Sequence, residues 1–134
     1  ENKPNKIDSV IADGYQVEID LWLKNDQFFL GHDSPTYEIS LDWLVERNKY
    51  LWIHCKNIEG FSSLISSELN YFWHEFDKYA LTSKNYIWSL PGNEFKSKNC
   101  INVLPERKLK NFDLNFCDFD LYGGLCSDFI GNLN

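Results

Sequence analysis

The sequence has few of the residues that mark linkers and chain breaks. It contains four prolines, seven glycines and no methionine among 134 residues. No repeat, low-complexity block or Gly/Ser-rich linker interrupts it, so we expect one domain over residues 1–134. No apolar run approaches the ~20 residues of a transmembrane helix, and none resembles the apolar segment of a signal peptide. We therefore expect no membrane span and a cytoplasmic location.

Positive charge is also scarce. The 13 Lys and Arg residues stand against 20 Asp and Glu residues, which gives a formal net charge of −7. Because nucleic acids and anionic membranes attract basic proteins, this balance argues against nucleic acid as a partner. The negative net charge still allows a small phosphorylated substrate, since a bound metal ion can supply local positive charge. The sequence gives no indication of the oligomeric state.

The cysteines lack the spacing of a metal site. Cys55, Cys100, Cys117 and Cys126 form neither a CxxC motif nor a zinc-finger pattern. Isolated thiols of this kind are typical of buried, neutral cysteines in a reducing compartment. We expect that role for all four.

What the sequence does contain is short strands that alternate with short helices. One helix follows Pro4 and stops at Gly14, a second follows the capping residue Ser40, and a third begins near Ile58. Seven segments have the length and composition of strands: 17–23, 28–31, 50–56, 71–76, 86–89, 101–104 and 125–127. With 43% hydrophobic and 16% aromatic residues, these elements can bury a core.

Alternation of strands and helices favours a parallel sheet or barrel. A typical (β/α)₈ barrel has ~250 residues, so a barrel built from this chain would lack several helices. We therefore expect an α/β protein, a reduced TIM-type (β/α) barrel with short helices. Incomplete closure of the barrel is the open alternative.

Ionisable side chains lie near the ends of several predicted strands. Side chains two residues apart on a strand share a face, and the carboxyl ends of barrel strands meet at one mouth. The residues expected around that mouth are Glu18, Asp20, His32, His54 and Lys56. Their order and spacing together point to a single cavity lined by charged groups.

The residue types suggest a chemistry. Two carboxylates on one strand face suit a hard cation such as Mg²⁺ or Ca²⁺. An imidazole such as His32 can act as general acid or base near neutral pH, and Lys56 can stabilise a phosphoryl oxygen. Taken singly, each residue has a structural explanation: alternation at the surface for Glu18 and Asp20, a hydrogen-bonded turn for His32, a salt bridge for Lys56.

The order of these motifs resembles the glycerophosphodiester phosphodiesterase family, within the PI-PLC-like phosphodiesterase superfamily. The similarity is specific mainly over residues 1–56 and weak between 71 and 122. The matching segments are Glu1-Asn2, Glu18-Ile19-Asp20, His32-Asp33, Ile53 to Lys56, and Cys126 to Asp128.

Two departures from the family pattern matter. The family's His-Arg-Gly strand, which carries one of two catalytic histidines, would precede Glu1 and is not in the sequence. We expect either further residues upstream or an incomplete barrel without that histidine. His54 stands where the family has a metal-binding glutamate, and imidazole is a softer, neutral ligand. That change raises Mn²⁺ or Zn²⁺ as alternatives to Mg²⁺ or Ca²⁺.

The resemblance implies a metal-dependent phosphodiesterase acting on a glycerophosphodiester or a related sugar-linked phosphodiester. Glu18 and Asp20 would hold the cation with His54 as third ligand, His32 would move the proton, and Lys56 would bind the phosphate. The residues that would wall the substrate cavity, unless they belong to the core, are Trp22, Trp52 and Trp88. The alternatives are an inactive module on the same fold that binds a phosphorylated ligand or serves a structural role, and an accidental resemblance.

Overall fold

A computed structural model describes residues 2–107 and 119–132. The chain divides into two compact units, residues 1–73 and residues 74–134, and each is described by itself. The division concerns local compactness, so the expectation of one domain over the whole chain stays a prediction.

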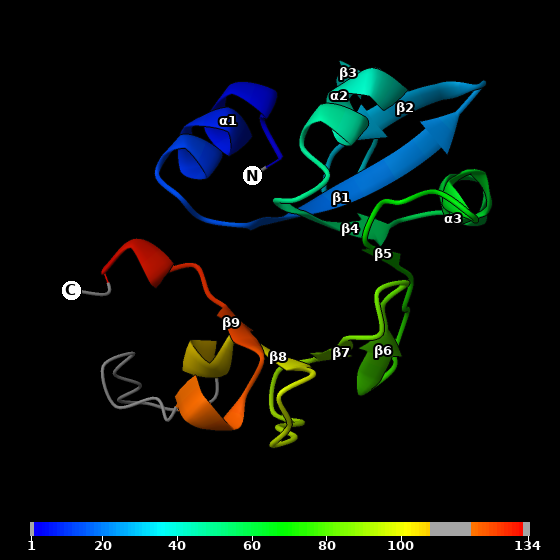
Figure 1. Cartoon of the computed structure of the whole chain (residues 1–134). Helices are drawn as coiled ribbons and strands as arrows, with labels where there is room; N and C mark the ends of the chain where they lie inside the picture. The colour runs from blue at the N-terminus through cyan, green and yellow to red at the C-terminus, as the bar shows by residue number, and fades with distance from the viewer. Residues whose placement is uncertain (1, 108–118, 133–134) are drawn as a thin grey trace. The chain divides into compact units, whose positions relative to one another are not determined.

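The first unit is a mixed five-stranded sheet with three α-helices (Figure 1). Its strand order is β3-β2-β1-β4-β5, so that β1 lies in the middle. Its elements in chain order are α1 (Pro4–Ala12), β1 (Val17–Lys24), β2 (Gln27–Leu30), β3 (Tyr37–Ile39), α2 (Leu41–Glu46), β4 (Leu51–Cys55), α3 (Ile58–Leu64) and β5 (Tyr71–Phe72).

The two neighbours of β1 run in opposite directions. β4 pairs with β1 in parallel, with Asp20 opposite His54. β2 pairs with β1 antiparallel because Asn25 and Asp26 form a tight hairpin turn between the strands. Both turn residues have a positive φ, 52° and 60°, which is the backbone that two-residue hairpins require and that Asn and Asp tolerate. The hairpin brings the chain after β2 back beside the middle of β1.

Local sequence signals start the helices where they were expected. Pro4 stands at the beginning of α1, and the Ser40 hydroxyl accepts a hydrogen bond from the Trp43 amide at the start of α2. Asn57 caps α3 and also reaches across to β1. Its Oδ1 accepts from the Gly60 amide at 3.2 Å and from the Leu23 amide at 3.1 Å, and its Nδ2 donates to the Leu23 carbonyl at 2.7 Å.

The core of the first unit lies on one face of β1 and β4. Ile19 and Leu21 alternate with the acidic residues of β1, and Ile53 and Cys55 alternate with Trp52 and His54 on β4. The four residues Ile19, Leu21, Ile53 and Cys55 are fully buried. Burial of such side chains contributes about 1.5–3 kcal/mol each. The alternation leaves the opposite face of these two strands to polar side chains.

The second unit contains a four-stranded sheet of order β6-β7-β8-β9. β6 pairs with β7 antiparallel, and the other two pairs are parallel. Its elements in chain order are β6 (Tyr79–Leu81), β7 (Ile87–Ser89), β8 (Cys100–Val103), η1 (Pro105–Arg107), η3 (Phe119–Leu121), β9 (Gly124–Cys126) and η4 (Ile130–Asn132), where η marks a short 3₁₀ helix.

The expected reduced TIM-type barrel is wrong. Across residues 2–107 and 119–132 the strands form two separate mixed sheets, and no closed barrel is present. The reason is that consecutive strands are often joined by short turns instead of helices. The β1–β2, β2–β3 and β6–β7 pairs are therefore antiparallel, whereas a (β/α) barrel needs a helical crossover between parallel neighbours.

Two further expectations can be compared with the fold. None of the described helices is long and apolar enough to cross a membrane. Cys55, Cys100 and Cys126 are free thiols, and burial raises the pKa of Cys55 to about 12, so that thiol is neutral as expected. Cys117 lies outside the described residues.

The double role of Asn57 gives a stability prediction. Replacing Asn57 with Ala removes the cap of α3 and two hydrogen bonds to Leu23 on β1, so we expect a loss of about 2–3 kcal/mol. Ser40→Ala is the matched control, because it removes a cap alone and should cost about 1 kcal/mol. Urea unfolding followed by tryptophan fluorescence measures both. Equal losses in the two variants would contradict the bridging role of Asn57.

Candidate functional site

Asp20 is the centre of a polar cluster on β1. Its side chain is only 4% exposed. Oδ2 lies 2.9 Å from His32 Nδ1 and accepts from Asn2 Nδ2 at 2.9 Å. Oδ1 lies 3.0 Å from His54 Nδ1 and 3.4 Å from Lys56 Nζ. Four nitrogen atoms from three separate parts of the sequence thus surround one carboxylate.

The sheet register explains why these groups meet. Asp20 and His54 are direct partners in the parallel β1–β4 pair, so their side chains lie side by side on one face. Lys56 follows two residues later, with its amide bonded to the Leu21 carbonyl at 2.8 Å. His32 arrives from the other side, because the hairpin places Gly31 against β1 with its amide donating to the Asp20 carbonyl at 3.1 Å.

The expected convergence of Asp20, His32, His54 and Lys56 is therefore present in the structure, but by a different route. His32 reaches the cluster through an antiparallel hairpin rather than from the end of a parallel strand. Asn2 completes the cluster from before α1, and it also accepts from the Asp20 amide at 2.9 Å. In the sequence Asn2 stands out only as part of a motif match, because a contact across 18 residues leaves no local signal.

The cluster keeps Asp20 ionised. Burial raises the pKa of its carboxyl, but hydrogen bonds from His54 and His32, the positive charge of Lys56 and a hydrogen bond from Asn2 outweigh burial and lower the pKa from 3.8 to about 2. An ionised carboxylate only accepts hydrogen bonds. It follows that both imidazoles donate their Nδ1 proton to Asp20, which fixes their orientation.

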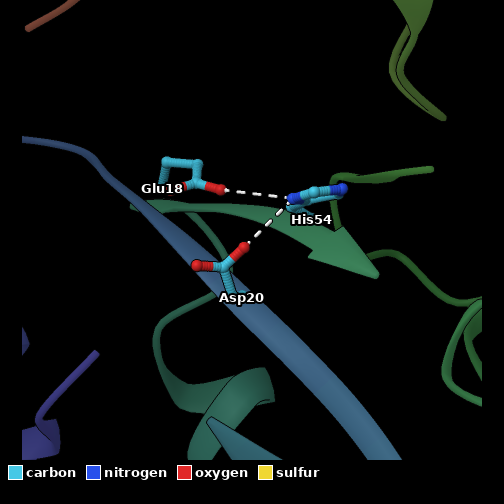
Figure 2. A group of neighbouring side chains, drawn as sticks. All are labelled: Glu18, Asp20 and His54. Atoms are coloured by element: carbon cyan, nitrogen blue, oxygen red, sulfur yellow. Dashed lines mark hydrogen bonds and ion pairs between the residues drawn. The ribbon is translucent and has the colours of Figure 1, made fainter. Parts of the chain in front are cut away.

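Within the described part of the chain, Glu18, Asp20 and His54 form a group that could hold a metal ion. One ligand atom from each lies within 4.8 Å of the others, and Glu18 Oε1 is 3.9 Å from His54 Nδ1 (Figure 2). Ligands that sit 2.0–2.6 Å from a divalent ion are at most about 5 Å apart. The three residues therefore fit such an ion, provided that His54 gives up its Nδ1 proton.

Packing holds His54 in place on its other side. The imidazole stacks on the ring of Phe72, with centroids 5.3 Å apart and planes 3° from parallel. Phe72 lies on β5, opposite His54 in the parallel pair. The ring of His54 is thus clamped between an aromatic face and an ionised carboxylate, whereas the side chain of His32 is 58% exposed.

The three tryptophans expected around a substrate cavity have different positions. The indole N–H of Trp22 donates to the Gly31 carbonyl at 2.6 Å, directly before His32. The indole N–H of Trp52 donates to Gln16 Oε1 at 2.6 Å. Trp88 is buried in β7 of the second unit. A role for any of them in substrate binding stays a prediction.

The chain matches no protein-family model, no curated protein and no solved structure. The similarity to glycerophosphodiester phosphodiesterases thus stays a resemblance of motifs, and the functional argument depends on the geometry of the cluster.

The lowered pKa of Asp20 predicts how the metal-free protein responds to acid. The pKa of this carboxyl falls from 3.8 to about 2 on folding. The ionised group therefore stabilises the fold at pH values above its unfolded-state pKa. That stabilisation is lost as the pH falls through its folded-state pKa. The shift corresponds to roughly 2 kcal/mol. We expect Asp20 alone to lower the free energy of unfolding of the wild type by that amount between pH 5 and about pH 2. Urea titrations in the presence of EDTA measure this change.

In Asp20→Asn this component of the acid dependence should be missing, since the amide does not titrate. Asp8→Asn serves as the control for loss of one acidic side chain, because Asp8 pairs with Arg47 outside the cluster. An Asp20→Asn profile as steep as that of the wild type would show that Asp20 is not held in the ionised form by folding.

Proposed function

We propose that this protein is a metal-dependent phosphodiesterase that cleaves a small glycerophosphodiester or a related sugar-linked phosphodiester. The observation that carries the proposal is the buried, ionised Asp20, which orients two imidazoles and lies within metal-binding distance of Glu18 and His54. The donor set supports a cation site beside an acid–base group, and the reaction class is what the motif resemblance implies. The substrate class follows from the motif resemblance.

In this proposal the cation binds to Glu18, Asp20 and His54. Carboxylate oxygens suit Mg²⁺ and Ca²⁺, and the imidazole favours Mn²⁺ or Zn²⁺. The bound ion would neutralise the phosphate and lower the pKa of the attacking water or hydroxyl. Glu18 is 28% exposed at its side chain, so a ligand can approach this edge of the cluster.

His32 acts as the general acid or base. Asp20 holds its Nδ1, so proton exchange with a substrate falls to Nε2, as in other carboxylate–imidazole pairs. The ring is 58% exposed, and a substrate can therefore reach it. In the cleavage step the doubly protonated ring would donate its Nε2 proton to the leaving alkoxide and become neutral, while Nδ1–H stays bonded to Asp20.

Lys56 supplies positive charge for the phosphate. Its side chain is 19% exposed, and Nζ lies 3.4 Å from Asp20 Oδ1. With a cation held by the carboxylates, the ammonium group of Lys56 would be free to bind a phosphoryl oxygen.

One observation favours a second candidate, a non-catalytic module that binds a phosphorylated ligand. His54 Nδ1 and Lys56 Nζ both approach Asp20 Oδ1, so the charge of Asp20 is compensated by the chain's own residues without a cation. In that case Lys56 and His32 would bind a phosphate and no bond would be cleaved.

A cytoplasmic location is part of the proposal. Cys55, Cys100 and Cys126 are free thiols, and unpaired cysteines are typical of reducing compartments.

Hydrolysis of bis(p-nitrophenyl) phosphate tests the proposal. With Mg²⁺, Ca²⁺ or Mn²⁺ present we expect turnover that EDTA abolishes. His32→Ala and Glu18→Gln should each lower kcat/KM by about 100-fold or more, because one loses proton transfer and the other a cation ligand. Glu38→Gln is the matched control for Glu18→Gln, since Glu38 is an exposed carboxylate on β3 of the same sheet. The activity of Glu38→Gln should stay at the wild-type level.

Thermal unfolding separates the two candidate functions. An enzyme with a cation site should gain stability from the metal ion, and Glu18→Gln should reduce that gain. A non-catalytic module should gain stability from glycerol phosphate in EDTA and show no turnover. Metal ions that leave the unfolding temperature unchanged, together with His32→Ala and Glu18→Gln at wild-type activity, would refute the proposed phosphodiesterase.

A further inference from the structure

The side chain of His32 is largely exposed to solvent. Its exposed fraction is 58%, and among the described residues the bond from its Nδ1 to Asp20 at 2.9 Å is its polar contact to the cluster. An exposed ring with so little packing depends on its backbone for its position. What fixes the backbone before His32 therefore decides where the imidazole points.

Gly31 is the residue that places His32, and it is held on both sides. Its amide donates to the Asp20 carbonyl at 3.1 Å, and its carbonyl accepts the indole N–H of Trp22 at 2.6 Å. Its φ of +155° is one that L side chains rarely adopt, and a Cβ there would collide with the Ser34 carbonyl oxygen. The chain turns sharply at Gly31 where it leaves β2. The hydrogen bond from the Trp22 indole on β1 stabilises this turn.

Trp22 is well placed for this task. It lies two residues after Asp20 on β1, so both side chains share one face of the strand. In the β1–β2 pair it stands opposite Phe29, one step from Leu30 and the exit at Gly31. Asp20 thus holds the imidazole of His32, and Trp22 holds the backbone that carries it.

We propose that Trp22 is a positioning residue for His32, acting through the hydrogen bond from its indole N–H to the Gly31 carbonyl. Loss of that bond lets the loop move, which weakens the contact from His32 Nδ1 to Asp20. The two tautomers of the neutral imidazole then both become populated. The catalytic consequence rests on the proposed phosphodiesterase function, but the positional one does not.

The chain offers a matched pair of variants. Trp22→Phe and Trp52→Phe each remove one indole donor that makes a 2.6 Å hydrogen bond. Both residues lie on neighbouring strands of the same sheet. Only Trp22 is bonded to the His32 loop, because Trp52 donates to Gln16. A general loss of an aromatic donor would affect both variants alike.

The primary readout is the tautomer of His32 in metal-free protein, from long-range proton–nitrogen NMR spectra assigned with His32→Ala. We expect the Nδ1–H form in the wild type and in Trp52→Phe, and a clear rise of the Nε2–H form in Trp22→Phe. The proposal is overturned if Trp22→Phe keeps the wild-type tautomer, if Trp52→Phe loses it equally, or if the wild type already has the Nε2–H form.

A second measurement needs no variant and covers the case in which Trp22→Phe fails to fold. In the wild type the indole N–H of Trp22 should exchange with solvent more slowly than that of Trp73, whose ring is 38% exposed. Equal exchange rates would contradict the hydrogen bond to Gly31.

Activity separates this inference from the proposed function. If the wild type cleaves phosphodiesters, Trp22→Phe should lower kcat about tenfold or more and leave KM within about twofold, because orientation of the proton donor is lost while binding is kept. If no turnover occurs but the tautomer shifts, the positioning role of Trp22 stands and the reaction assigned to the site is wrong.

Discussion

The first unit depends on compensating one buried negative charge. The carboxylate of Asp20 is almost completely removed from water, and an isolated ion in that position would cost several kcal/mol. His54 and Lys56 come from β4 and its end, His32 from the hairpin, and Asn2 from the segment before α1. Together they offset the cost of burying the charge, so the pairing of β1 with both neighbours is tied to this single side chain.

The same arrangement produces the candidate site. The Asp20 carboxylate already accepts hydrogen bonds from two imidazoles and lies beside one ammonium group, so a cation entering beside Glu18 would have to compete with His54 Nδ1 and Lys56 Nζ. Such competition would link metal binding to release of Lys56 toward a phosphate. The interactions that stabilise β1 and those that would carry the chemistry are therefore the same contacts, and a change in one alters the other.

The sequence predicted local geometry well and long-range geometry poorly. Alternation along β1 correctly separated Glu18 and Asp20 from the buried Ile19 and Leu21, and Ser40 correctly marked a helix start. The barrel was wrong because alternating strands and turns do not specify the direction in which distant strands pair. The short strands β3 and β6 were missed. The role of Asn2 could not be found without the fold.

The central claim is that folding holds Asp20 as a carboxylate between His32 and His54. A pH titration of the Asp20 carboxyl carbon by NMR, in metal-free wild-type protein, measures this directly. The account predicts a single residue-specific transition near pH 2, well below the ordinary value of about 4. A transition at or above that ordinary value would contradict the account, because burial would then outweigh the hydrogen bonds and Asp20 could not orient the two imidazoles.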